Sequence, residues 1–133
     1  MSKLDEICQR VVSDVDGALA TALVDLDTGM LTGSHHTVPY FTQTYLDAVA
    51  AAAVDMFRGK TVSRVEDLLS KQRGDDTKHL VKEVQMTTDN TFHFMSIVPG
   101  KESTLMVLIT QKSTNLGMGW SGLRAALKDV ASA

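Results

Sequence analysis

The longest apolar segment of the chain has the pattern of one helix that is hydrophobic on two sides. Over residues 41–59 (FTQTYLDAVAAAAVDMFRG), two stripes recur at helical spacing. The first stripe contains Phe41, Tyr45, Val49, Ala52 and Met56, and the second contains Leu46, Ala50, Ala53 and Phe57. A surface helix normally carries one such stripe, so this helix must be covered on two sides. We expect one cover to be the protein's own sheet and the other a second copy of the chain, the alternative being two internal covers.

The remaining pattern predicts further helices and five strands. The helices are expected at residues 3–15, about 62–69 and 116–130, and a polar loop at 73–78. The strands are expected at residues 18–26, 30–36, 80–87, 91–98 and 104–111. The first and fifth strands are apolar on both faces, which is typical of central strands, and the second is polar and contains a glycine, which is typical of an edge.

These elements predict one α+β domain over residues 1–133. Its five-stranded antiparallel sheet would have the order 2-1-5-4-3, with the long helix on one face and the N- and C-terminal helices on the other. Gly117, Gly119 and Gly122 each weaken the last helix by roughly 1 kcal/mol relative to Ala. They either let its first turns fray or allow close packing, and the sequence leaves both open.

Composition excludes several classes of function. The 133 residues are 44% hydrophobic and 22% charged with a net charge of -3, so there is no basic footprint for nucleic acid. No apolar run is long enough for a membrane span, and the N-terminus does not resemble a signal peptide. The single cysteine, Cys8, lies on an apolar helix face and fits a reducing compartment. We therefore expect a cytoplasmic protein without a nucleic-acid or membrane partner.

The sharpest enzymatic motif is Asp27-Thr28-Gly29, which matches the core of the aspartic protease signature. That chemistry would need Asp27 from two protomers to share a proton across a two-fold axis. Such sites need a small residue after the glycine, whereas Met30 follows here, and no second hydrophobic-glycine element is found downstream. An ordinary β-turn is the favoured interpretation, and a homodimeric protease is the weaker alternative.

Other residues that could carry chemistry do not form a site. Gly59-Lys60-Thr61 ends like a phosphate-binding loop, but Val54 occupies the position of that motif's first glycine. The four histidines (His35, His36, His79 and His93) lack metal-ligand spacing and are expected at the surface or at a sheet edge. We therefore predict no catalytic residue, no metal and no cofactor.

Two stretches carry a resemblance to a known family. Val15-Asp16-Gly17-Ala18 with the stretch from Ala22 to Leu31, ALVDLDTGML, resembles the opening of the Roadblock/dynein light chain family: a helix ending at glycine, an apolar strand, an acidic-glycine turn and a second strand. Leu105–Ile109, Asn115-Leu116-Gly117 and Leu123-Arg124 resemble the family's last strand and final helix. The element order matches nearly the whole chain, although the segment between Lys60 and His79 is longer than in the family.

The resemblance implies a homodimer or heterodimer. In the family, the central helices pair and the third strands join two sheets, which here would involve residues 41–58 and 80–87. The implied interface residues are Tyr45, Val49, Ala52, Met56, Val81, Glu83 and Gln85.

The resemblance also implies a non-enzymatic function. Members are binding modules on dynein or in lysosomal scaffolds, and bacterial members regulate small Ras-like GTPases by reshaping the GTPase without supplying a catalytic residue. A partner of this kind would contact exposed residues of the paired helices, namely Gln43, Asp47 and Arg58. A small-molecule sensor is the rival class, because an antiparallel sheet flanked by helices can hold a ligand.

Overall fold

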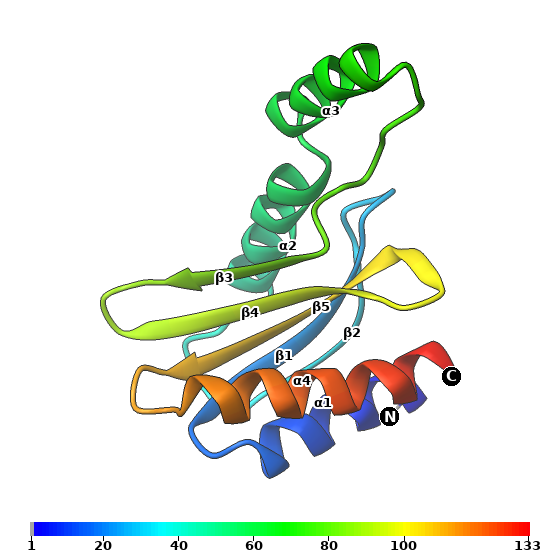
Figure 1. The fold of residues 1–133 in the computed structure, drawn as a ribbon. Coiled ribbons are helices and arrows are strands. Elements are labelled where there is room, and N and C mark those ends of the chain that lie inside the picture. Colours follow the sequence, from blue (N-terminus) through cyan, green and yellow to red (C-terminus); the bar gives the residue numbers. More distant parts are fainter. Residues whose placement is uncertain (1) are drawn as a thin grey trace.

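The computed structural model describes residues 2–133, and its elements follow the order expected from the sequence (Figure 1). They are α1 (Lys3–Asp14), β1 (Ala18–Asp25), β2 (Leu31–His36), α2 (Gln43–Arg58), α3 (Lys60–Arg73), β3 (Glu83–Thr87), β4 (Thr91–Val98), β5 (Lys101–Gln111) and α4 (Leu116–Ala131). Met1, the first residue of the predicted domain, lies outside the described residues.

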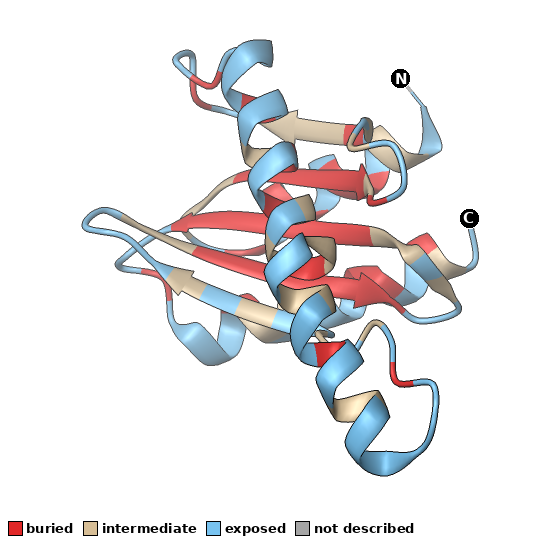
Figure 2. Cartoon of the chain, turned by 90° about the horizontal axis from the view of Figure 1, so that it is seen from above, coloured by how far each residue is buried: buried red, intermediate tan, exposed pale blue. Residues whose placement is uncertain are grey.

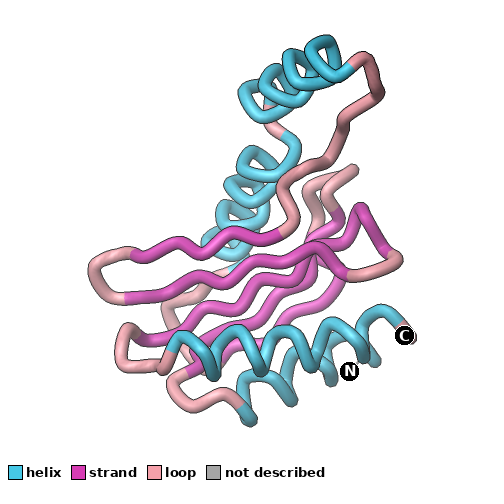
Figure 3. Tube along the Cα trace, in the orientation of Figure 1, coloured by secondary structure: helices cyan, strands magenta, loops and turns pink. Residues whose placement is uncertain are grey.

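The sheet confirms the predicted topology. Its strands are antiparallel and lie in the order β2-β1-β5-β4-β3. The two central strands, β1 and β5, are buried along most of their length, because helices cover both faces of the sheet. The helices α1 and α4 pack on one face and α2 packs on the other, as Figures 1 and 3 show. The sheet, with β1 and β5 in its interior, therefore separates two hydrophobic cores.

Glycines set the distance between α4 and the elements beneath it. A Cβ atom on Gly119 would lie 2.5–3.0 Å from the ring of Phe94 on β4. A Cβ atom on Gly122 would overlap the side chain of Val15, which follows α1. Gly117 has only the Asn115 Oδ1 atom nearby, at 3.2 Å from such a Cβ. Two of the three helix glycines thus allow close packing, which resolves the question that the sequence left open.

The segment between α2 and β3 departs from the prediction in two ways. The helix α3 has 14 residues and extends through Arg73, where the sequence analysis expected a loop. It ends at Gly74, which has the left-handed conformation that terminates many helices, after basic residues in its last turn. A signal for the longer helix was therefore present in the sequence.

The third strand begins at Glu83 and not at Leu80, so that prediction was wrong. His79 has a positive φ of 54°, which interrupts extended backbone immediately before Leu80. The Leu80 amide then donates to the carboxylate of Glu66 on α3, at 2.7 Å. Leu80, which was expected to point inward, is 44% exposed because this segment follows α3 and not the sheet.

The two edges of the sheet differ. On β2, the outward Ser34 amide donates to Asp5 Oδ1 of α1 at 2.9 Å. A Cβ atom on Gly33 would lie 2.9 Å from Leu4 Cβ, so the helix touches the strand backbone directly. The first helix therefore covers the β2 edge, which prevents another strand from pairing there.

The Asp5 contact predicts a pH-dependent contribution to stability. The Ser34 amide, and then the Ser2 hydroxyl, hold the pKa of Asp5 below its ordinary value of 3.8. A depressed pKa in the folded state contributes stability that is present above the unfolded pKa and is lost as pH falls through the folded pKa. We expect Asp5→Asn to lower the free energy of unfolding at pH 7, with a difference from wild type that shrinks below about pH 4. Denaturant unfolding at several pH values measures it, and a difference independent of pH would contradict the assignment.

The glycine contacts predict opposite behaviour of two neighbouring substitutions. Gly119→Ala forces a methyl group into the Phe94 ring and should lower the free energy of unfolding by about 1–3 kcal/mol. Gly117→Ala is the matched control, because it adds the same methyl group at an exposed site and should change stability by less than about 1 kcal/mol. Thermal or urea unfolding of both variants tests the contrast, and equal effects would show that α4 is not held at this distance.

Candidate protein-binding face

The helix α2 is fixed on the sheet by one of the two predicted stripes. Leu46, Ala50, Ala53 and Phe57 are buried, the last three completely. Thr42 begins the helix, its hydroxyl accepting a hydrogen bond from the Tyr45 amide at 3.2 Å. Figure 2 shows α2 running across the sheet above the buried strands. The second stripe therefore faces the protein's own core.

The first stripe lies mostly outside the core. Tyr45 and Ala52 are exposed, and Val49 and Met56 are half-buried at the core margin. Phe41 is the exception: it precedes the helix and is buried next to Val38. The flank formed by Tyr45, Val49, Ala52 and Met56 is called the β3-side flank below.

The direction of this flank follows from the position of the opposite one. Gln43 and Asp47 border the β1–β2 turn near Met30, and Ala51 and Val54 border the same turn near Asp27. Because β2 and β3 are the two ends of the sheet order, the flank that carries Ala52 points towards β3. The predicted interface residues of α2 thus share one flank, and the predicted partner-binding residues Gln43 and Asp47 lie on the other.

The edge of β3 has free backbone groups. The Ile97 amide donates to the Lys82 carbonyl at 3.0 Å, and the Thr88 amide donates to the Thr91 carbonyl at 2.9 Å. In an antiparallel pair such bonds recur at every second residue, so the backbone groups of residues 82, 84, 86 and 88 point to β4. Those of Glu83, Gln85 and Thr87 point outward from the sheet.

The side chains of β3 fasten the strand to α4. Glu83 accepts from Arg124 Nη2 at 3.2 Å, and Gln85 Oε1 accepts from Trp120 Nε1 at 2.9 Å. The Arg124 guanidinium lies 5.0 Å from the Trp120 ring centroid, within the range of a cation–π contact. The side chains of Glu83 and Gln85, two of the predicted interface residues, are thus engaged by α4. Their backbone groups are the ones left available to a neighbouring strand. Val81 precedes the strand and packs half-buried on the α2 side of the sheet.

The three predicted partner-binding residues do not form one cluster. Gln43 Nε2 donates to Asp47 Oδ1 at 2.8 Å, and both line a hollow of about 340 Å³ beside Met30, which is 67% exposed. Arg58 lies roughly 16 Å farther along the helix, at 1.5 Å per residue. Its guanidinium donates to the Glu102 carbonyl at 2.7 Å, which holds the end of α2 against the start of β5.

Comparison with solved structures identifies the fold. MglB of Myxococcus xanthus is 18% identical with a TM-score of 0.72, covering 99% of this chain and 94% of MglB. A Roadblock/LC7 domain from Streptomyces avermitilis is 20% identical with a TM-score of 0.71, covering 97% and 95%. The fold is that of a Roadblock/LC7 domain. The gliding protein MglB of Thermus thermophilus is also similar, with 16% identity, a TM-score of 0.70 and coverage of 96% and 84%. No protein-family profile matches the sequence, and neither does any curated protein.

The fold match confirms the resemblance at the level of architecture. It covers nearly the full length of the chain, including the long segment between Lys60 and His79. At identities of 20% and below, it carries no statement about individual residues.

In this Roadblock/LC7 fold, Asp27 belongs to an exposed turn between β1 and β2. The Gly29 amide donates to the Asp25 carbonyl at 2.7 Å, an α-turn bond rather than that of the expected β-turn, and Gly29 has a positive φ of 76°. The Asp27 amide donates to Asp25 Oδ1 at 3.0 Å, which is the arrangement of an Asx turn. The turn borders the α2 flank opposite Ala52. Pairing through the β3-side flank would therefore keep the two Asp27 side chains apart, and a shared proton between them is not supported.

The histidine prediction was wrong for His93. Its side chain is buried on β4, and burial lowers the pKa of the imidazole. Its Nε2 lies 3.1 Å from the Thr91 hydroxyl. Within residues 2–133, His, Cys, Asp and Glu side chains form no group of three or more that could hold a metal ion. The buried thiol of Cys8 agrees with its prediction as a core residue, and burial raises its pKa to about 12.

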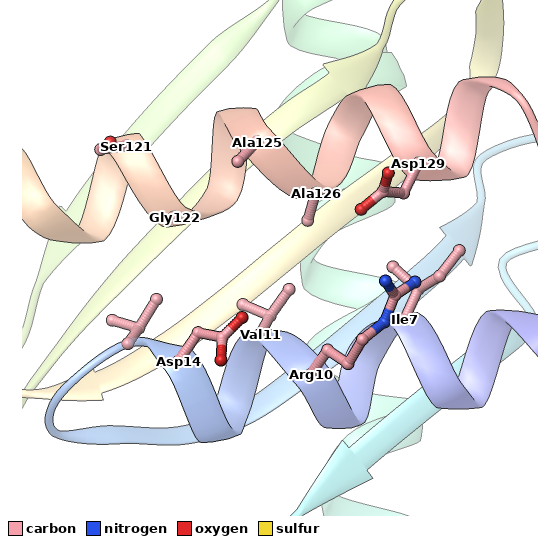
Figure 4. Close-up of a pocket in the computed structure, with 10 residues that line it drawn as sticks. Ile7, Arg10, Val11, Asp14, Ser121, Gly122, Ala125, Ala126 and Asp129 are labelled. Atoms are coloured by element: carbon pink, nitrogen blue, oxygen red, sulfur yellow. The ribbon is translucent and has the colours of Figure 1, made fainter.

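A groove lies between α1 and α4 (Figure 4). Its floor contains Val11, Gly122 and Ala126, and Arg10 and Asp129 flank it. Its volume of about 240 Å³ is below the roughly 300–1,000 Å³ of typical ligand pockets. The groove therefore gives the small-molecule sensor interpretation no specific support. Over residues 2–133, the structure also has no helix with the length and hydrophobicity of a membrane span.

The two stripes of α2 predict different effects of the same substitution. Ala52→Arg places a charge on the exposed β3-side flank and should leave the fold intact, whereas Ala53→Arg buries an unpaired charge against the sheet and should unfold the protein. Circular dichroism with thermal unfolding measures both. Unfolding of the Ala52→Arg variant would show that the helix is rotated relative to this description.

Proposed function

We propose that the chain is a dimeric, non-catalytic binding module that regulates or scaffolds a small Ras-like GTPase. The observation that carries this proposal is the apolar β3-side flank of α2, which is exposed or half-buried and lies next to a sheet edge with free backbone groups. In a monomer, an open strand edge and an exposed apolar surface would both be sites of aggregation. A second copy would cover both at once.

The difference between the two sheet edges supports the proposed dimer. The β2 edge is covered by α1 and closed by the Asp5–Ser34 hydrogen bond. The β3 edge offers the backbone of Glu83 and Gln85 in the geometry that strand addition requires. Because both features belong to one surface patch, a two-fold axis can pair the patch with itself. The proposed interface contains Tyr45, Val49, Ala52, Met56, Val81, Glu83 and Gln85.

The GTPase partner is supported by the Roadblock/LC7 fold and by similarity to proteins named MglB, one of which is described as a gliding protein. We place the partner surface on the β2-side flank of α2, which dimerisation leaves free. It contains the hydrogen-bonded pair Gln43–Asp47 beside exposed Met30, and the proposal extends it to Arg58. A cytoplasmic location is part of the same proposal, since Ras-like GTPases act there.

A charge-reversal pair tests the partner surface. Asp47→Lys should weaken binding of the cognate GTPase by about tenfold or more, because it inverts a charge at the centre of the proposed contact. Asp129→Lys is the matched control: it makes the same change at an exposed site on α4, on the other face of the sheet, and should bind as wild type does. Calorimetric titration and single-turnover GTP hydrolysis measure both effects.

The proposal fails if small Ras-like GTPases encoded in the same genome neither bind the protein nor change their rate of GTP hydrolysis in its presence. Equal weakening by the two substitutions would leave a GTPase partner but move its site away from Gln43 and Asp47.

A further inference from the structure

Exposed large apolar side chains gather at opposite ends of α2. Tyr40 and Tyr45, which are 73% and 36% exposed, lie at its N-terminal end. Val65 and Leu68, which are 53% and 52% exposed, lie on α3, past its C-terminal end. Neither set is covered within the protomer. Exposed apolar side chains grouped in this way are typical of an interaction surface.

One side of α3 is hydrogen-bonded to the segment that follows it. Glu66 is buried and accepts from the Leu80 amide at 2.7 Å. The Ser70 hydroxyl accepts from the Thr77 amide at 2.6 Å and donates to the Thr77 carbonyl at 3.0 Å. Val65 and Leu68 lie on the other side of the helix. Figures 1 and 3 show that α3 and this returning segment project beyond the sheet.

The joint between the two helices gives α3 a defined direction. Only Gly59 separates them, and a Cβ atom there would overlap the carbonyl of Asp55. The returning segment ties the far end of α3 back to β3. The helix is therefore connected at one end to α2 and at the other, through residues 77–80, to the segment that leads to β3.

The tyrosines at the other end are also held in place. Phe41 is buried, its ring stacks on Tyr45 with centroids 4.6 Å apart, and Tyr40 meets it edge-on at 5.3 Å. The buried phenylalanine thus orients two exposed aromatic rings. Pre-oriented tyrosines are common anchors of protein interfaces, because little conformational entropy is lost on binding.

The β3-side flank of α2 is too small to hold a dimer by itself. A 16-residue helix is about 24 Å long, so a flank about 10 Å wide offers roughly 240 Å². A stable interface needs about 800 Å² from each partner. Strand pairing at β3 adds directional hydrogen bonds but little apolar area. Further contact must come from elements that continue this surface.

A two-fold axis supplies that contact. If both copies keep α2 on the same face of a joined sheet, the axis stands perpendicular to the sheet and the α2 helices run antiparallel. The C-terminal end of each α2 then approaches the N-terminal end of the other. From this geometry, and resting on the dimer of the proposed function, we propose that each α3 seats Val65 and Leu68 on Tyr40 and Tyr45 of the second copy.

Site-directed cross-linking tests the proposal on the full chain. Tyr40→Cys and Leu68→Cys variants are prepared separately, mixed for subunit exchange and oxidised. Native Cys8 can remain, because its thiol is completely buried. We expect a covalent dimer in the mixture that contains one chain of each kind. A mixture of Leu68→Cys with Met118→Cys, an exposed site on α4, is the control and should form none.

Dimer affinity provides the second measurement. The double variant Val65→Asp, Leu68→Asp should raise the dimer dissociation constant about tenfold or more, whereas the control Gln72→Asp, an exposed polar site on α3, should leave it unchanged. Both changes lie at exposed positions, so folding should be retained. Analytical ultracentrifugation gives the constants.

The outcomes separate this inference from the function beneath it. A stable dimer with no cross-link between positions 40 and 68 and no effect of the double variant overturns the α3 contact and leaves the proposed dimer standing. A wild-type protein that is monomeric at all concentrations overturns both. In that case Val65 and Leu68 would face a different protein.

Discussion

An antiparallel sheet has two edges, and in this protein helix α1 covers the β2 edge whereas the backbone of the β3 edge is open. The roles of the remaining helices depend on this difference. The first helix lies along β2 and uses the Asp5 carboxylate to satisfy an outward amide of that strand. The last helix binds the side chains of β3 through Arg124 and Trp120, yet leaves the strand's backbone uncovered. Helices on the same face of the sheet therefore cover one edge and leave the backbone of the other open.

The long helix α2, on the opposite face of the sheet, also has one covered side and one open side. Its alanines lie in two environments: Ala50 and Ala53 are buried and let the backbone approach the sheet, and Ala52 is exposed on the outer surface. Larger residues at positions 50 and 53 would disrupt the close approach to the sheet. Because the flanks of one helix point to β2 and β3 separately, the proposed partner and the proposed second copy would not compete for the same surface.

Several of these features follow from periodicity alone. The doubly apolar strands required helices on both faces, which led to the correct strand order and to two cores. The helix predicted over residues 41–59 is present and one of its stripes meets the sheet, because a 3.6-residue repeat reports which side chains can share a face, whereas a cover over the other stripe stays a prediction. The pattern could not say which stripe met the sheet. That depends on how the helix is rotated about its axis, which contacts remote in sequence decide.

The errors arise where contacts between distant residues override the local pattern. Leu80 continues the alternation of the strand in the sequence, but its amide bonds to Glu66 and the left-handed His79 precedes it, so Leu80 lies against α3. His93 was expected at the surface, and burial by neighbouring strands reverses that expectation.

The amino-acid sequence by itself determined the elements, the central strands and the Roadblock-like order, because these depend on local periodicity and on which surfaces must avoid water. Only the tertiary structure decided which sheet edge is open, which flank of α2 is exposed and where β3 begins. Single hydrogen bonds and close contacts between residues far apart in the chain make those choices, and they leave no periodic trace in the sequence.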